Sequence, residues 1–226
     1  LGDLSHPLLK RMSIEAPGTF QHSMLVATLS EQAAEAIGAD SIFTRVACYY
    51  HDVGKMKRPN FYVENQKGGI NPHDKLSPNL STLIIKSHTK DGQEMGKEFK
   101  IPKEIRDIMA EHQGTTFLAY FYNKAKKGDS TVEASDFRYD GPKPKTKESA
   151  VIMLADSIEA AVRTLEDKDP VSVEKMIRKL IAAKIDDEQL SDADLTLKEI
   201  EIIIKTFVKV LGGVYHNRIK YPDQKK

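Results

Sequence analysis

Apolar side chains recur every three or four residues along most of this chain, which is the spacing of helices with one buried face. The pattern is clear in residues 19–37, where Leu25, Leu29 and Ala36 fall on one side. Gly38 follows directly, and glycine tolerates the left-handed conformation in which many helices end. We therefore predict a long amphipathic helix over residues 19–37.

The same periodicity predicts further helices in the middle and at the end of the chain. They cover residues 41–51, 102–112, 117–126, 147–165, 173–185 and 197–219. Ser41 is placed to cap the first of these. Strict alternation of apolar and polar residues, which marks a half-buried strand, does not occur, so the predicted fold class is all-α. We expect a single domain over residues 1–226, with residues 1–14 and 221–226 at its periphery.

Two long stretches interrupt the helical pattern, one over residues 56–81 and one over residues 128–146. Both are rich in proline and glycine. Loops of this length are uncommon within one domain, and they often form lids or binding loops. Disorder is the competing interpretation, but the aromatic residues Tyr62, Phe137 and Tyr139 weigh against it. We expect the two loops to lie over a functional site.

Composition narrows the possible partners. Lys and Arg number 34 and Asp and Glu 33, so the net charge is +1, which argues against a DNA or RNA polymer as the partner.

No run of the chain approaches the roughly 20 apolar residues that span a bilayer. The first residue is Leu1 rather than methionine, so we expect a piece of a longer protein. The single cysteine, Cys48, excludes an intramolecular disulfide, and its apolar neighbours predict a place in the core.

Histidine and aspartate residues supply the candidate chemistry. His51 and Asp52 are adjacent at the end of a predicted helix, and Asp156 lies within an apolar helical run. A charge in such a run is costly to bury unless it is paired or binds a metal. His22, His88 and His112 also lie beside apolar residues of separate segments. Imidazole and carboxylate groups together suit zinc, manganese or iron, so we predict a metal site inside the helical bundle.

This pattern resembles the HD superfamily of metal-dependent phosphohydrolases, which is named for its adjacent His-Asp pair. The resemblance implies an all-α helical bundle in which His22, His51, Asp52 and Asp156 hold one metal. His88 and His112 resemble the additional histidines of the superfamily's two-metal branch. Further stretches resemble the cytoplasmic HD domain of the seven-transmembrane-receptor HD hydrolases, which cleave cyclic di-AMP. These stretches are residues 51–55, 71–78, 87–92 and 111–115.

The resemblance implies that a cyclic dinucleotide, cyclic di-AMP, is hydrolysed to pApA. Two divalent ions, manganese or iron, would share a hydroxide that attacks phosphorus. Asp52 would bridge the two ions, since a carboxylate has two oxygens. The resemblance also implies a longer parent protein that is anchored in a membrane with this domain on the cytoplasmic side. The last predicted helix could serve a homodimer.

Lys55 follows the His-Asp pair closely enough to contact a phosphate, as the resemblance also implies. In the first loop, Arg58, His73, Asp74 or Lys75 could bind the second phosphate or protonate the leaving oxygen, although each is also consistent with a solvated loop residue. Tyr62 or Phe61 could stack on adenine. We expect His6 and His216 to be surface or capping groups.

The chain also departs from the pattern of the HD-GYP type within the two-metal branch, whose members carry Gly-Tyr-Pro after a His-His pair. No Gly-Tyr-Pro follows His112 here, and Glu111 stands where the first histidine of that pair is common. Glu111 could therefore be an oxygen ligand or could face solvent. Three alternative functions remain open at this point. They are a one-metal nucleotidase or triphosphohydrolase, a di-iron oxygenase, and a regulatory module without catalysis.

Overall fold

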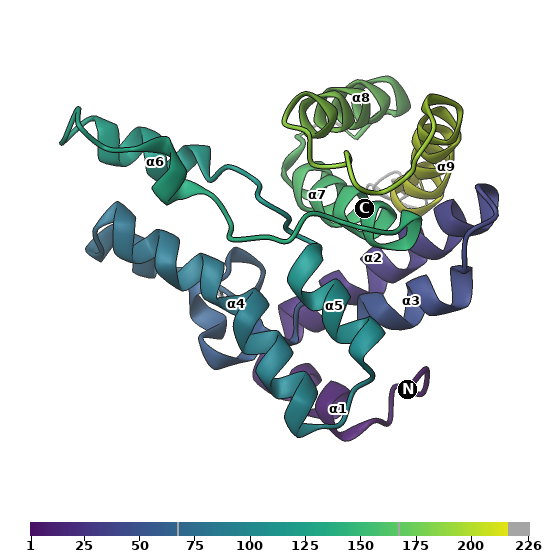
Figure 1. Cartoon of the computed structure of the whole chain (residues 1–226), viewed down its shortest axis with the longest axis horizontal. Helices are drawn as coiled ribbons and strands as arrows, with labels where there is room; N and C mark the ends of the chain where they lie inside the picture. Colours follow the sequence, from purple (N-terminus) through teal and green to yellow (C-terminus); the bar gives the residue numbers. More distant parts are fainter. Residues whose placement is uncertain (67, 167, 217–226) are drawn as a thin grey trace, which may run out of the picture.

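The computed structural model describes residues 1–66, 68–166 and 168–216, and within them the chain is helical and has no strand (Figure 1). One isolated backbone bridge joins Phe117 and Arg138. The all-α expectation is therefore confirmed. The helices are α1 (Pro7–Glu15), α2 (Pro17–Ala36), α3 (Ser41–Tyr50), α4 (Pro78–Glu98), α5 (Lys103–Glu111), α6 (Ala119–Lys126), α7 (Lys147–Thr164), α8 (Pro170–Asp186) and α9 (Leu197–His216).

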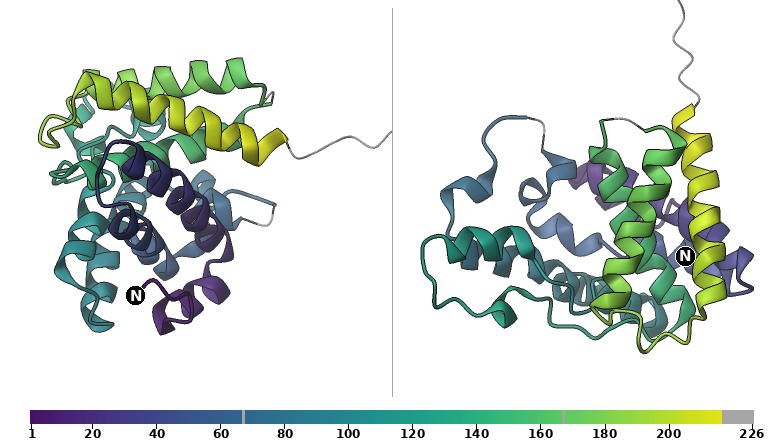
Figure 2. Two further views of the ribbon diagram at one scale, coloured as in Figure 1. Left: turned by 90° about the vertical axis from the view of Figure 1, so that its right-hand side faces the viewer. Right: turned by 90° about the horizontal axis from the view of Figure 1, so that it is seen from above.

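Helix α2 lies at the centre of the bundle and contacts α1, α3, α7 and α9. Figure 2 shows α8 and α9 side by side on one side of the molecule, while α4 and α6 extend toward the opposite end. The main core includes Leu29 of α2, Ile158 of α7 and Phe207 of α9, none of which is exposed. Cys48 also lies in this core, as expected, and burial raises the pKa of its thiol to about 12. No helix of the described residues is long and apolar enough to cross a bilayer.

The N-terminal segment differs from the expectation that residues 1–14 are peripheral. Residues 7–15 form helix α1, and its side chains Leu8, Leu9 and Met12 are fully buried in the main core. The helix starts at Pro7, which suits a first turn, and the His6 side chain accepts a hydrogen bond from the Leu8 amide at 3.3 Å. His6 is thus a capping group. The apolar face was too short to stand out from the sequence alone.

Most predicted helices appear within a few residues of their expected bounds. Helix α3 is capped by Asp40 and not by Ser41, because the Asp40 carboxylate accepts the Phe43 amide at 2.9 Å. Helix α6 begins at Ala119, and α8 begins earlier than expected, at Pro170. The predicted end of the last helix, residues 217–219, and the expected peripheral tail, residues 221–226, lie outside the described residues. So does the side chain of His216.

Both long loops have defined structure. The first contains four short 3₁₀ helices, η1 (Val53–Lys57), η2 (Pro59–Phe61), η3 (Val63–Asn65) and η4 (Pro72–Lys75), before α4 begins at Pro78. The second contains η5 (Ala134–Phe137), whose Phe137 is fully buried against Phe121 and Ala125 of α6. Aromatic anchoring of this kind offsets the entropy lost when a loop becomes ordered.

Gly54 allows an unusually close approach between η1 and α4. A methyl group at this position would lie 2.0 Å from the carbonyl oxygen of His88 and 2.5 Å from the amide nitrogen of Gly92. The space that a side chain would fill at Gly54 is taken by the backbone of α4. The missing side chain therefore brings the His88 helix against the segment that carries His51 and Asp52.

The burial of α1 generates a test. We expect Met12→Ala to lower the free energy of unfolding by about 2–5 kcal/mol, because it leaves a cavity in the main core. Ile14 of the same helix is 80% exposed, so Ile14→Ala is the matched control and should change it by no more than about 0.5 kcal/mol. Urea denaturation of both variants measures the difference. Equal stability of the two variants would show that α1 is peripheral after all.

Candidate metal centre

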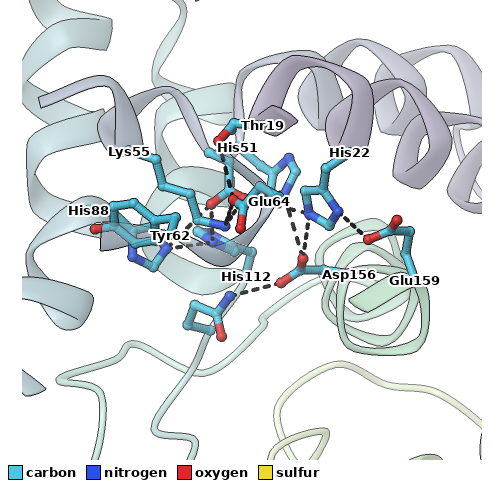
Figure 3. A network of polar contacts seen from close by, with 12 residues as sticks. Thr19, His22, His51, Lys55, Tyr62, Glu64, His88, His112, Asp156 and Glu159 are labelled. Carbon is cyan, nitrogen blue, oxygen red and sulfur yellow. Dashed lines mark hydrogen bonds and ion pairs between the residues drawn. The ribbon is translucent and has the colours of Figure 1, made fainter. Parts of the chain in front are cut away.

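Six side chains from five regions of the chain converge at one buried point (Figure 3). His22 comes from α2 and Asp156 from α7, while His88 lies within α4. His51 and His112 are the C-caps of α3 and α5, and Asp52 follows His51 directly. Each of the six is at most 7% exposed. All six residues that the sequence predicted as metal ligands are thus brought together.

Asp52 lies between two groups of histidines. Its Oδ1 is 3.4 Å from Nε2 of His88 and 3.4 Å from Nε2 of His112. Its Oδ2 is 3.4 Å from Nε2 of His51 and 3.6 Å from Nε2 of His22. The potential ligand atoms of His22, His51, Asp52 and Asp156 lie within 4.8 Å of one another, as do those of Asp52, His88 and His112. Asp52 belongs to both groups, which is the arrangement that two neighbouring ions require.

Backbone carbonyls fix the orientation of three of these imidazoles. Nδ1 donates to the carbonyl of Cys48 in His51 (2.7 Å), of Ile85 in His88 (2.6 Å) and of Met109 in His112 (3.0 Å). A carbonyl can only accept, so Nδ1 carries a proton in all three rings, and Nε2 is the ring nitrogen that is left to face the cluster. The Nε2 atoms of His88 and His112 lie only 3.1 Å apart. Two nitrogens at this distance need either a proton shared between them or a metal ion beside both.

Buried polar atoms without hydrogen-bond partners also indicate that cations bind at this cluster. Among the described residues, Nε2 of His51 and both carboxylate oxygens of Asp52 are buried without a well-aligned hydrogen bond. Burial raises the pKa of Asp52, but Lys55 and His51 outweigh it and hold the pKa well below its usual range. Asp52 is therefore an anion with free lone pairs in the interior, which is costly unless cations bind it. The donor set of imidazole nitrogens and carboxylate oxygens fits divalent transition metals.

A second layer of contacts holds the candidate ligands in place. Nδ1 of His22 lies 2.5 Å from a Glu159 oxygen, and its Nε2 lies 2.8 Å from Oδ1 of Asp156. The Gln113 amide donates to the other Asp156 oxygen at 2.8 Å. Burial lowers the pKa of His22, but the bonds to Asp156 and Glu159 outweigh it and raise the pKa to about 8. Carboxylates that orient metal-binding histidines in this way are common around metal sites.

Glu159 and Gln113 were not among the residues predicted for the site. Glu159 was detectable in principle, since it lies three residues after Asp156 and so on the same face of a helix otherwise filled with apolar residues. Gln113 follows His112, beyond the end of α5, where no periodicity predicts the direction of a side chain.

Lys55 occupies the predicted position beside the cluster. Its Nζ lies 2.6 Å from Oδ2 of Asp52 and 2.9 Å from Glu64, and only 12% of its side chain is exposed. Burial lowers the pKa of Lys55, but Asp52 and Glu64 outweigh it and raise the pKa well above the usual value, so Lys55 is a cation. Glu64 also accepts the Thr19 hydroxyl at 3.2 Å, which ties the first loop to the start of α2.

A cavity of about 430 Å³ opens beside the cluster and is lined by Lys55, His88 and Gln113 at its inner end. Half of its other lining residues are aromatic, namely Phe61, Tyr62, His73, Tyr120, Phe121 and Tyr139. The Tyr62 hydroxyl donates to the Ile84 carbonyl at 3.2 Å, and the His73 ring lies between Phe61 and Phe121. The two long loops thus meet over the candidate site, as expected.

The structure does not bring every predicted substrate contact to this cavity. Tyr62, His73 and Lys55 line it, whereas Arg58 and Lys75 do not. Arg58 is directed toward Asp91, whose carboxylate lies 3.5 Å away, and 48% of its side chain is exposed. Lys75 is exposed at the end of η4. The direction of these loop side chains depends on how the loop packs, which residue type alone does not reveal.

Glu111 is directed away from the metal ligands. It is 5% exposed, accepts the Ser149 hydroxyl at 2.9 Å and lies 3.3 Å from the Lys145 amide. It therefore neither ligates a metal beside His112 nor faces solvent, and instead joins the end of α5 to the start of α7. Glu111 also borders a cavity of about 600 Å³, which is larger than the cavity beside the cluster but contains none of the six candidate ligands. The donor cluster, and not cavity size, identifies the site.

The fold and the cluster agree with comparisons with known proteins. The HD domain family profile matches residues 19–161. The chain belongs to the HD domain family, which confirms the family expected from the His-Asp pattern.

Relatives within this family include two bacterial enzymes. The chain is 50% identical over 226 residues to the cyclic-di-AMP phosphodiesterase PgpH of Bacillus subtilis (strain 168). It is 50% identical over 225 residues to PgpH of Listeria monocytogenes serotype 1/2a (strain 10403S). The whole chain is covered in both cases, but it spans only 32% and 31% of the two relatives.

Solved structures of the HD domain of one of these relatives also match this chain. The crystal structure of the L. monocytogenes PgpH HD domain is 50% identical, matches with a TM-score of 0.90, and covers 94% of this chain and 100% of its own. A second structure of that domain, in complex with cyclic di-AMP, matches with a TM-score of 0.91 over 96% of this chain and 100% of its own.

The contact between His22 and Glu159 generates a prediction. We expect Glu159→Gln to lower divalent-metal affinity about tenfold or more, because the His22 ring loses the charged partner that orients it and makes it basic. Glu35→Gln is the matched control, since Glu35 is an exposed glutamate on the same helix as His22. Competition with a chelating indicator measures both affinities. Equal affinities in the two variants would contradict a role for Glu159 at the metal centre.

Proposed function

We propose that this domain is a metal-dependent phosphodiesterase that hydrolyses cyclic di-AMP to the linear dinucleotide pApA. One observation carries the proposal: the buried Asp52 carboxylate is shared by two groups of candidate ligands beside an aromatic cavity. The relatives named cyclic-di-AMP phosphodiesterase, and the related domain in complex with cyclic di-AMP, support this substrate.

His22, His51, Asp52 and Asp156 would hold one divalent ion, and Asp52, His88 and His112 would hold the second. Manganese and iron both suit this mixture of nitrogen and oxygen donors. When bound, such ions supply a water molecule of lowered pKa as nucleophile and neutralise charge on the phosphate. The two groups share one carboxylate, which favours two ions over the single ion of a nucleotidase.

Lys55 is the residue of this chain best placed to act on the phosphate. It is a cation at the inner end of the cavity, and Asp52 and Glu64 both contact its Nζ. In a mostly buried site, a fixed positive charge stabilises negative charge that develops on phosphoryl oxygens. We assign Lys55 to substrate binding and to stabilisation of the transition state.

The aromatic walls would bind the substrate's base. The rings of Tyr62, Phe121 and Tyr139 are each at most 9% exposed and form a rigid surface on which adenine can stack. Of the loop residues considered as proton donors to the leaving oxygen, His73 lines the cavity, so we assign this role to His73. Its Nε2 donates to the Phe61 carbonyl at 3.0 Å, so Nδ1, which has no hydrogen-bond partner among the described residues, is the atom that would have to carry the transferred proton.

The longer protein to which this domain would belong is also part of the proposal. The chain spans about a third of the length of the two PgpH relatives, so the activity of a whole parent protein is part of the proposal. Anchoring to the inner face of a membrane and formation of a homodimer are expected from the resemblance, and each stays untested.

A product analysis tests the proposed function. Protein loaded separately with manganese and with iron is incubated with cyclic di-AMP, cyclic di-GMP and a nucleoside triphosphate, and the products are resolved by ion-exchange chromatography. We expect cyclic di-AMP to give pApA in preference to the other reactions. His51→Ala and Asp52→Ala should abolish turnover and lower the metal content, because each removes a candidate ligand.

The circular dichroism of these variants should retain nearly all of the helical signal, which separates lost chemistry from lost folding. Full activity in either variant would contradict the ligand assignment. Turnover of the triphosphate alone would instead support a nucleotidase or triphosphohydrolase. Consumption of oxygen by the iron form would support a di-iron oxygenase.

Lys55→Ala should lower kcat about 10²–10³-fold while the metal content stays at the wild-type level, since it removes one fixed cation from the phosphate site. Lys57→Ala is the matched control, because Lys57 is a partly exposed lysine of the same 3₁₀ helix that pairs with Asp91 and Glu94. Steady-state kinetics with parallel metal analysis measures both. Unchanged turnover of Lys55→Ala would remove Lys55 from the mechanism.

A further inference from the structure

Helices α8 and α9 form a pair that packs on α7 and α2 (Figure 2). Both helices lie beyond the HD domain profile, which ends at residue 161. Among the described residues, none of their side chains belongs to the candidate ligands or lines the cavity beside them. The segment that joins the two helices nevertheless carries one polar side chain, Gln189, that is fully buried. A buried amide in a loop calls for an explanation, because it must find hydrogen-bond partners there.

Gln189 packs against the turn that follows the candidate ligand His112. Its Oε1 accepts the Thr115 amide at 2.8 Å, and its Nε2 donates to the Thr115 hydroxyl at 2.9 Å. Nε2 also donates to the Asp187 carbonyl at 3.0 Å. A backbone amide can only donate and a carbonyl can only accept, so these partners determine the orientation of the Gln189 amide. Both of its ends are therefore paired, and its main partner lies 74 residues away in the chain.

Gly114 allows Gln189 to approach this turn closely. The φ angle of Gly114 is +53°, which glycine adopts at little cost. A methyl group at this position would lie 2.4 Å from Oε1 of Gln189 and 2.8 Å from the terminal methyl of Met153. The Gln189 side chain and the turn are thus fitted together, and a change in one must displace the other.

Two cationic side chains hold the same turn. Lys184, in the last turn of α8, donates to the Thr116 hydroxyl at 2.8 Å. Arg138 donates to the Thr115 carbonyl at 2.8 Å and also contacts the Asp187 carboxylate at 2.8 and 3.0 Å. The end of α8 and the segment after it therefore determine the path of residues 113–116.

This turn carries a residue that contacts a candidate metal ligand. Gln113 lies between His112 and Gly114, and its amide donates to Oδ2 of Asp156 at 2.8 Å. The other oxygen of Asp156 lies 2.8 Å from Nε2 of His22. The Gln113 amide thus holds one carboxylate oxygen and leaves the other directed at the ligand cluster. Hydrogen bonds that orient a ligand in this way strengthen metal binding about 10–100-fold.

We propose that Gln189 is a positioning residue of the metal centre, which acts through the 113–116 turn and the Gln113 amide on Asp156. The inference rests on the proposed function, in which Asp156 is a metal ligand. Without the Gln189 amide, Thr115 loses the partner of its backbone N–H and of its hydroxyl, and the Gln113 amide no longer holds Asp156 in one orientation. The α8–α9 pair is then part of the metal centre, although it contributes no ligand.

Manganese binding tests this route. The apparent dissociation constant for Mn²⁺ is measured by competition with a chelating indicator for the wild-type protein, Gln189→Leu, Gln113→Leu and the double variant. Leucine fills a similar space but forms no hydrogen bond. We expect Gln113→Leu to raise the dissociation constant about tenfold and Gln189→Leu about fivefold. The double variant should match Gln113→Leu alone, because both substitutions interrupt the same route.

Val173→Ala controls for a general loss of stability. Val173 is a buried residue of α8 and lies about three helical turns before Lys184, so its truncation weakens the packing of α8 without touching the 113–116 turn. We expect this variant to bind Mn²⁺ as tightly as the wild-type protein at a temperature where both are folded. Urea denaturation of Gln189→Leu and Val173→Ala compares their losses of stability.

The outcomes separate the positioning role from the function on which it rests. An unchanged dissociation constant in Gln189→Leu, while the wild-type protein binds Mn²⁺, overturns the positioning role alone. Effects that multiply in the double variant overturn the route through Gln113. An equal loss of affinity in Val173→Ala also overturns it, because the effect then passes through the stability of the fold. Wild-type protein that binds no divalent metal contradicts the proposed function itself, and the positioning role with it.

Discussion

The buried charge of Asp52 is the constraint on which the rest of the structure depends. Its carboxylate is fully shielded from water, and each oxygen lies within 3.6 Å of two imidazole nitrogens. An isolated anion in such a place would be very costly, so the surrounding elements must supply positive charge. Lys55 supplies part of it, and the imidazole Nε2 atoms that surround the carboxylate mark where bound cations would supply the remainder. Five separate segments of the chain converge on this one group.

Backbone geometry then determines how closely these segments approach. At Gly54 there is no room for a side chain, since the carbonyl of His88 occupies that space. His51 and His112 sit at helix ends, where each ring donates to a carbonyl of its own last turn. The ring orientation is thus set locally, while the distance between rings is set by the contact of η1 with α4. Both are needed before the Nε2 atoms can face a common point.

The candidate ligands were predictable from sequence, but most of their supporting residues were not. His22 and Asp156 stand out because a charge or an imidazole within an apolar helical run needs a partner. Glu64 carries no such signal, because it lies in a loop whose path is set by hydrogen bonds to the start of α2. Arg58 is the opposite case. A cation in that loop is a reasonable candidate for a phosphate contact, but the packing of the loop directs its side chain toward Asp91.

The sequence by itself determined the all-α class, most helix positions and the residues of the candidate metal centre. These follow from periodicity and from the cost of burying a charge, which are properties of short segments. Only the tertiary structure decided that α1 is part of the core, that Glu111 joins α5 to α7, and that Arg58 is directed toward Asp91. Each of these depends on contacts between segments distant in the chain, and no local pattern encodes which surfaces will meet.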